Sequence, residues 1–390
     1  MINKKFNDKD VNLSVLKERA YNLRWATQPD GVIPLTAADP DFECSKNILS
    51  AVQEYSDAGY FSYTPAEGLP ELKSAMHHFL IKKRNYVVPQ ELILPINSAA
   101  FGVFLTCQTF LQPADEAIIF DPVDFLFQYS ICQVGASPVR FAIPPGTTDV
   151  DFTQLEKLIT PRTRMICLCN PLNPTGKVFK LDELKILGEI AVKHNLIILS
   201  DEIWSDIVFK PAMFTSIGSI SEEISNRVIL VTGFSKSYGL AGLRIGIIAS
   251  ANDELFSKLF EASLHQSTIH GTNSIGQIAA TAALQHSQEW LNSFVHHLQS
   301  MRDLVSTRIN AMARLSTRAP DGCYVSLIDV RNTGMSSQEF QTKMLKEAKV
   351  ALVPGLSQWF GPGAEGYVRL SFATSAEILE EALNRIESKL

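Results

Sequence analysis

The sequence contains no Cys-x-x-Cys motif, no long hydrophobic run and no cluster of basic residues. Its six cysteines are scattered over 390 residues, whereas disulfide scaffolds are short and dense in cysteine. A disulfide framework is therefore excluded, and metal binding is disfavoured. No apolar stretch approaches the roughly 18–20 residues that cross a bilayer. Lys and Arg number 35 and Asp and Glu 41, a net charge of −6, which disfavours nucleic-acid binding because that depends on clustered cations.

The composition is that of a chain with a large core. Hydrophobic residues make up 46% and charged residues 19%, which excludes disorder as the dominant state. The first residues, Met1–Asp8, are polar and lack the apolar core of a signal peptide. We therefore expect a soluble, cytoplasmic protein of more than one domain, with small-molecule partners, no bound metal and no membrane or nucleic-acid partner.

The middle of the chain alternates short apolar runs with helical stretches. The segments 98–111 and 181–194 each place apolar side chains on one helical face. The runs between such segments are apolar nearly throughout, which is typical of a mainly parallel sheet covered by helices on both faces. The predicted strands are Glu91–Ile96, Glu116–Phe120, Val139–Ile143, Met165–Cys169, Leu196–Ser200, Val228–Thr232 and Ile245–Ala249.

The two ends of the chain show a different pattern. After Gln285 come a long helical stretch, two predicted strands (Gly322–Asp329 and Gly366–Phe372) and a last helix that opens on a capping box, Thr374–Glu377. The sequence thus predicts an α/β fold with one large domain and a smaller α+β domain built from both chain ends. The predicted boundaries give residues 1–50 and 286–390 to the smaller domain and 51–285 to the large one.

Several motif-like strings carry no function. Gly361–Gly366 fits G-x-G-x-x-G, but it precedes a strand instead of joining a strand to a helix, so we expect a surface loop. The His77–His78 and His296–His297 pairs lie in helical segments, where adjacent side chains point apart.

Polar side chains follow three of the predicted strands. Asn173 follows the strand 165–169, Asp201 follows 196–200, and Lys236 follows 228–232. In an open parallel sheet the ligand crevice lies outside the carboxyl ends of the strands. Alone, these residues have simpler explanations as a turn, a helix cap and a solvated cation. Together, they suit an aldehyde cofactor, because a lysine forms an imine, a carboxylate holds a pyridinium proton and an amide binds a ring hydroxyl.

Three segments in one order, Asn170–Gly176, Asp201–Ile203 and Gly233–Gly246, resemble the class I/II aminotransferases, fold-type-I pyridoxal-phosphate enzymes. The resemblance extends from about Val32 to the last helix. It implies an aspartate-aminotransferase-like fold with a seven-stranded sheet, and pyridoxal 5'-phosphate as the cofactor.

The resemblance also implies roles for individual residues. Lys236 resembles the catalytic Schiff-base lysine that moves a proton, and Asp201 resembles the partner of the pyridine nitrogen. Asn173 matches the contact to the ring hydroxyl and to substrate. Arg369 resembles the clamp on the substrate α-carboxylate, which it would bind in a bidentate manner, and the backbone N–H of Ala38 assists it.

The cofactor phosphate has its own set of matching residues. Ser235 and Arg244 match phosphate-binding positions, and Ala99 and Ala100 begin a helix whose N–H groups suit a dianion. Tyr63 matches a tyrosine that reaches the phosphate of the neighbouring subunit, which implies a homodimer with active sites at the interface.

Three positions depart from the family pattern. Trp204 replaces a tyrosine that meets the ring oxygen, and an indole N–H can donate but not accept a hydrogen bond. Gly233 replaces a serine or threonine near the phosphate. Asp124 stands where a ring-stacking aromatic is usual, so we take its neighbour Phe125 as the stacking residue.

The first hypothesis is an aminotransferase that moves an amino group from an L-amino acid to a 2-oxo acid through the Lys236 Schiff base. The alternative is a β-eliminating carbon–sulfur lyase, because Ala38–Phe42 resembles the A-D-x-D-F string of cystathionine-lyase-like members. A cofactor binder without turnover is disfavoured because Lys236, Asp201 and Arg369 are all present. No second arginine marks a dicarboxylate pocket, so the sequence does not name the amino acid.

Overall fold

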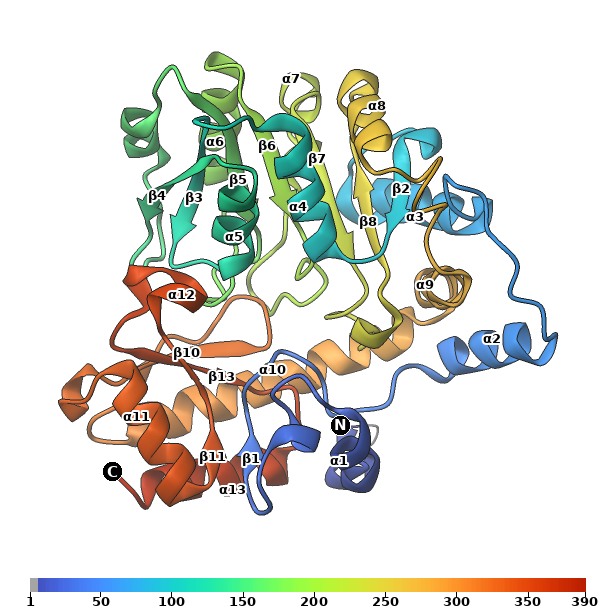
Figure 1. The fold of residues 1–390 in the computed structure, drawn as a ribbon. Helices are drawn as coiled ribbons and strands as arrows, with labels where there is room; N and C mark the ends of the chain where they lie inside the picture. The colour runs from blue at the N-terminus through green and yellow to red at the C-terminus, as the bar shows by residue number, and fades with distance from the viewer. Residues whose placement is uncertain (1–5) are drawn as a thin grey trace.

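The computed structural model describes residues 6–390, and a seven-stranded sheet lies at its centre (Figure 1). The strand order is β2-β8-β7-β6-β5-β3-β4. Strand β8 runs antiparallel to both of its neighbours, and the other pairs are parallel, which confirms the predicted mainly parallel sheet. The strands are β2 (Ile93–Ile96), β3 (Glu116–Asp121), β4 (Ser137–Ala142), β5 (Thr163–Cys169), β6 (Ile197–Asp201), β7 (Val228–Gly233) and β8 (Gly246–Ala249).

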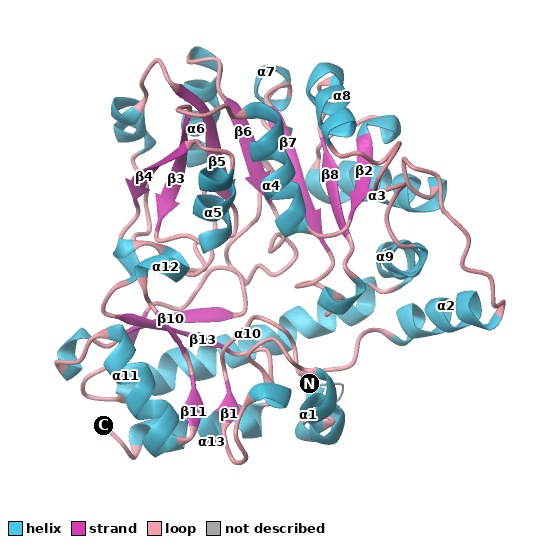
Figure 2. Cartoon of the chain, in the orientation of Figure 1, coloured by secondary structure: helices cyan, strands magenta, loops and turns pink. Residues whose placement is uncertain are grey.

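Helices cover both faces of this sheet, which is why its strands are buried nearly throughout, except the edge strand β4. Helices α4 and α5 lie in front of the sheet, and α6 lies behind it (Figures 1 and 2). The helices of this part are α2 (Lys46–Asp57), α3 (Pro70–Arg84), α4 (Ala99–Phe110), α5 (Phe125–Gln133), α6 (Leu181–Lys193), α7 (Glu222–Ser225), α8 (Asp253–Ala262) and α9 (Ser274–His286).

The two chain ends together form the smaller part of the fold, as expected. Strand β1 (Ile33–Pro34) pairs in parallel with β11 (Val350–Ala351), so an early segment lies beside a late one. A four-stranded antiparallel sheet has the order β12-β13-β10-β9. Its strands and the surrounding helices are β9 (Ser316–Thr317), β10 (Val325–Asp329), β12 (Val353–Pro354), β13 (Tyr367–Ser371), α1 (Leu13–Arg19), α10 (Gln288–Ala311), α11 (Ser337–Lys343), α12 (Ser357–Phe360) and α13 (Ala376–Glu387).

The observed bounds of the strands differ from the predicted ones by one to three residues, and the predicted start of the last helix is also wrong by one residue. The first strand begins at Ile93, because the preceding residues close a 3-10 turn in which Leu92 N–H donates to the carbonyl of Pro89. The last helix is capped by Ser375, whose hydroxyl accepts from the N–H of Ile378 at 3.3 Å. The hydroxyl of Thr374 is buried without a hydrogen-bond partner, so the predicted capping box does not form.

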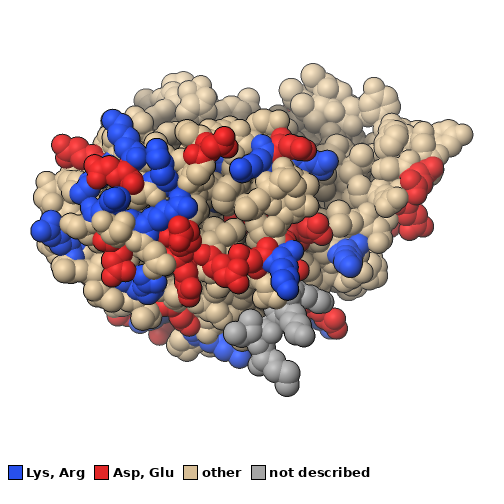
Figure 3. Space-filling model, turned by 90° about the horizontal axis from the view of Figure 1, so that it is seen from below, with Lys and Arg blue, Asp and Glu red and all other residues tan. Residues whose placement is uncertain are grey.

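Two surface features bear on partners. Within residues 6–390, no helix combines the length and the apolar character that crossing a membrane requires. On the face seen from below, basic and acidic side chains both occur among neutral ones (Figure 3).

Candidate active site

The carboxyl ends of β5, β6 and β7 lie side by side. The register places Cys169 opposite Asp201, and Asp201 opposite Val231. Asn173 and Lys236 lie on the loops that follow β5 and β7, and Asp201 is the last residue of β6. The polar residues that follow three separate strands are thus brought to one edge of the sheet, as parallel pairing requires.

Lys236 is held by the N-terminal segment. Its Nζ donates to the carbonyl oxygen of Ala38 at 2.7 Å, and the side chain is partly buried. Burial lowers the pKa of the Lys236 amine; Asp39 opposes this shift and Arg369 adds to it. An amine whose pKa is lowered gives up its proton more readily, which suits both imine formation and proton transfer.

Tyr324 and Trp204 complete the surroundings of Lys236. The hydroxyl of Tyr324, fully buried, donates to the same carbonyl of Ala38 at 3.1 Å. Its ring meets the ring of Trp204 edge-on at 4.7 Å, and the Lys236 Nζ lies 5.3 Å from the Trp204 ring centre. Sequence reasoning missed Tyr324, because an isolated tyrosine on an apolar strand has the signature of an ordinary core residue.

Asp201 ends β6 with its side chain almost entirely buried. Its Oδ1 accepts a hydrogen bond from the N–H of Ile203 at 3.0 Å. Burial raises the pKa of Asp201 to about 7; Asp124 raises it further, and Lys236 acts in the opposite direction. A buried carboxylate without a counter-ion favours a cationic ligand, and a pyridinium nitrogen is such a ligand.

Asn173 and Arg369 are joined by a hydrogen bond. The Arg369 Nη1 donates to the Asn173 Oδ1 at 3.0 Å, and its Nη2 donates to the carbonyl of Thr36 at 3.3 Å. The guanidinium also lies 5.0 Å from the ring centre of Phe360. Its Nε is buried and has no hydrogen-bond partner within residues 6–390. Since Asn173 Nδ2 in turn donates to Asp124 at 2.8 Å, the three side chains form one chain of contacts.

The start of α4 offers backbone donors at the edge of the sheet where β8 begins. Ala99 and Ala100 are its first two residues, and Ser98 caps it by accepting from the N–H of Phe101 at 3.1 Å. The first N–H groups of a helix have no intrahelical acceptor, so they suit an anion. Gly246 packs directly on this turn, since a Cβ at that position would lie 2.6 Å from the Ala99 nitrogen.

Two more predicted phosphate residues lie near the start of β8 and the end of β7. Arg244 precedes Gly246 by two residues, is exposed and has a left-handed backbone with φ of 51°. Among the described residues, its guanidinium forms no ion pair. Ser235 directly precedes Lys236 and is partly buried. Both are available for an anion.

Two predicted residues lie outside this set of contacts. Tyr63 is 87% exposed, and its ring lies edge-on to His270 at 4.7 Å in an open hollow. Phe125 begins α5, is 38% exposed, and meets the ring of Trp359 edge-on at 5.5 Å. Its stacking on a cofactor ring stays a prediction.

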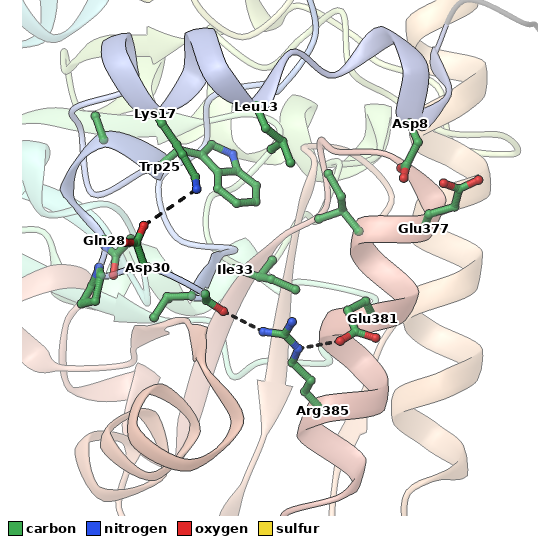
Figure 4. Close-up of a pocket in the computed structure, with 15 residues that line it drawn as sticks. Asp8, Leu13, Lys17, Trp25, Gln28, Asp30, Ile33, Glu377, Glu381 and Arg385 are labelled. Carbon is green, nitrogen blue, oxygen red and sulfur yellow. Dashed lines mark hydrogen bonds and ion pairs between the residues drawn. The ribbon is translucent and has the colours of Figure 1, made fainter.

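A second hollow, of about 500 Å³, lies between the N-terminal segment and α13 (Figure 4). Four of its charged side chains form ion pairs: Lys17 lies 3.8 Å from Asp30, and Arg385 lies 2.7 Å from Glu381. It shares no residue with the contacts around Lys236. Within residues 6–390, no group of three His, Cys, Asp or Glu side chains is placed to hold a metal ion.

The fold and the polar residues at this edge of the sheet agree with the comparisons to known proteins. The family model "Aminotransferase class I and II" matches residues 30–386, and the chain belongs to this family. An aspartate aminotransferase of Pyrococcus abyssi is 33% identical over 363 residues, 92% of each chain. The cystathionine β-lyase PatB of Bacillus subtilis is 29% identical over 362 residues, also 92% of each chain. A PLP-bound putative aminotransferase from Clostridium difficile superposes with a TM-score of 0.86 at 27% identity, covering 99% of this chain and 98% of that one.

Pyridoxal phosphate is the cofactor, and the described residues fit it. The lowered pKa of the Lys236 amine would suit an imine, the buried Asp201 carboxylate would suit the ring nitrogen, and the first N–H groups of α4 would suit the phosphate. These three groups lie at one edge of the sheet, and each has the chemistry that one part of the cofactor requires.

Proposed function

We propose that this enzyme transfers an amino group from an L-amino acid to a 2-oxo acid, with Lys236 as covalent anchor and proton carrier. The observation that best supports the proposal is the environment of the Lys236 amine. It is placed by the carbonyl of Ala38 and has a lowered pKa, and Asp201 lies on the adjacent strand end. When bound, pyridoxal phosphate supplies an electron sink for breaking the Cα–H bond.

Arg369 binds the α-carboxylate of the substrate in this proposal. Two of its nitrogens are occupied by Asn173 and Thr36, whereas the buried Nε has no partner. A buried unpaired donor costs about 1–3 kcal/mol, and a carboxylate would remove that cost. The clamp fixes the orientation of Cα, and Lys236 takes the proton from Cα and returns it to the acceptor carbon during transfer.

The proposed active unit is a cytoplasmic homodimer in which Tyr63 completes the phosphate site of the neighbouring subunit. Tyr63 lies on a surface that exposes other apolar side chains, including Phe61 and Ile269, and a protein interface would cover them. All six cysteines are unpaired, which is typical of a reducing compartment.

β-Elimination of a carbon–sulfur bond is the second candidate. It begins with the same removal of the Cα proton, and it is supported by the relationship to PatB and by the segment Ala38–Phe42. The two reactions separate after that step: transfer needs Lys236 to return the proton to a second carbon, whereas elimination needs a leaving group on Cβ.

One product assay distinguishes the two candidates. The holoenzyme is incubated with a panel of L-amino acids and 2-oxoglutarate, and separately with cystathionine alone. Transfer predicts glutamate in amounts equal to the 2-oxo acid formed from the donor. Release of pyruvate, ammonia and thiol from cystathionine, with no glutamate formed from any donor, would replace the aminotransferase proposal by the lyase.

A further inference from the structure

Asp124 occupies the position where a ring-stacking aromatic is usual, and its contacts show a different use. It precedes α5, where its Oδ1 accepts from the N–H of Leu126 at 3.1 Å. Its Oδ2 accepts from the Nδ2 of Asn173 at 2.8 Å. Each carboxylate oxygen therefore has its own donor, one in the backbone of a helix and one in the active site.

The contacts of Asn173 allow only one orientation of its amide. On one side its Nδ2 faces the carboxylate of Asp124, and on the other its Oδ1 faces the guanidinium of Arg369. A rotation by 180° would place the amide oxygen against a carboxylate and the N–H groups against a cation. The carboxylate on one side and the guanidinium on the other thus fix which end of the amide faces Arg369.

This orientation matters because the groups are shielded from water. Asn173 is 5% exposed and Arg369 is 8% exposed, so solvent cannot readily replace a lost partner. Among the described residues, the Arg369 Nε has no hydrogen-bond partner, so it remains available to a ligand.

We propose that Asp124 is a positioning residue that acts through Asn173 to hold Arg369 ready for the substrate α-carboxylate. This inference rests on the proposed role of Arg369 and applies equally to transfer and to elimination, since both bind an amino acid carboxylate. Asp124 itself touches neither substrate nor reacting atom in this role.

The competing explanation is that Asp124 only caps α5. Asn and Ser cap helices about as well as Asp, so Asp124→Asn and Asp124→Ser keep the cap. An asparagine has one acceptor oxygen and therefore cannot serve Leu126 and Asn173 through two separate oxygens, and a serine is too short to reach Asn173. Asp151 is a matched control, because it also caps a helical turn, accepting from the N–H of Thr153 at 3.0 Å.

The test compares steady-state kinetics of the holoenzymes. We expect Asp124→Asn and Asp124→Ser to raise KM for the amino acid about 10-fold or more, as for the loss of one charged hydrogen bond, with a smaller change in kcat. Asp151→Asn should leave both constants unchanged. In an Asn173→Ala background, Asp124→Asn should have little further effect, because residues that act through one another are not additive.

Unchanged KM in both Asp124 variants, or full additivity with Asn173→Ala, would overturn the positioning role. If one variant fails to fold, the other decides. A wild-type enzyme that neither turns over nor binds any amino acid would instead refute the proposed function, and it would be recognised before any variant is compared.

Discussion

Asp201→Asn should have opposite effects on the stability and on the activity of this enzyme. Among the described residues, the buried carboxyl group of Asp201 forms no ion pair, and burial raises its pKa from an ordinary value of 3.8 to about 7. This group therefore costs no stability below about pH 4, where it is protonated in both states; the cost grows as the pH rises from about 4 to 7 and is constant above that, where it is ionised in both states. Asparagine does not titrate and avoids this loss.

The size of the effect follows from those two pKa values. A carboxyl group with a pKa of 3.8 in the unfolded chain and about 7 in the folded chain destabilises the fold by about 2–3 kcal/mol more at pH 8 than at pH 5. The amide of the variant also leaves an N–H without a known partner, but this cost is the same at both pH values. The difference between the unfolding free energies of the wild type and the variant therefore changes with pH only through the ionisation of Asp201.

Urea unfolding of both apo-proteins at several pH values between 5 and 8 measures this change. We expect the variant to gain on the wild type as the pH rises from 5 to about 7 and the difference to level off above that. Pyridoxal phosphate should restore the wild type, because the pyridinium charge pairs with the carboxylate. The holoenzyme of the variant should turn over roughly 10–150-fold more slowly, the loss of one charged hydrogen bond of ~1.5–3 kcal/mol. A stability difference that stays constant from pH 5 to pH 8 would refute the reasoning.

Three further predictions concern the cofactor site. Lys236→Ala should fold but form no borohydride-reducible bond to pyridoxal phosphate, as measured by intact mass; a reducible bond in the variant would assign the anchor to another lysine. Gly246→Ala should weaken pyridoxal phosphate binding and lower stability by about 1–3 kcal/mol, because its Cβ would lie 2.6 Å from Ala99 N. Gly242→Ala, whose Cβ would meet nothing within 4 Å, is the control for stability. Mixing inactive Lys236→Ala with weakened Tyr63→Phe protomers should restore activity through hybrid sites that carry neither change, and a fully active monomer in sedimentation would contradict the dimer.

The sequence was informative where a local pattern determines structure. Nearly continuous apolar runs that alternate with helical segments are typical of strands of a covered sheet, and the residues that follow parallel strands lie at one edge of it, so the positions of Asp201 and Lys236 could be predicted from the sequence alone. Tyr324 could not, because its contact with the carbonyl of Ala38 joins residues 286 positions apart. The contact between Asp124 and Asn173, which are 49 positions apart, could not be predicted for the same reason. The domain boundaries near residues 50 and 285, and the individual roles of the site residues, stay predictions.

The hydrogen bond from Arg369 to the carbonyl of Thr36 joins residues 333 positions apart in the chain. At translation rates of about 5–20 residues per second, Arg369 is synthesised roughly 15–70 s after Thr36. During that time the central sheet, whose strands all lie between Ile93 and Ala249, is already complete in sequence and can fold while the ribosome still holds the remainder. The emerging chain thus carries Lys236 and Asp201 well before it carries the arginine that would hold a substrate carboxylate. In the proposed role of Arg369, the chain therefore cannot bind its substrate before this last segment has been synthesised and has docked against the first.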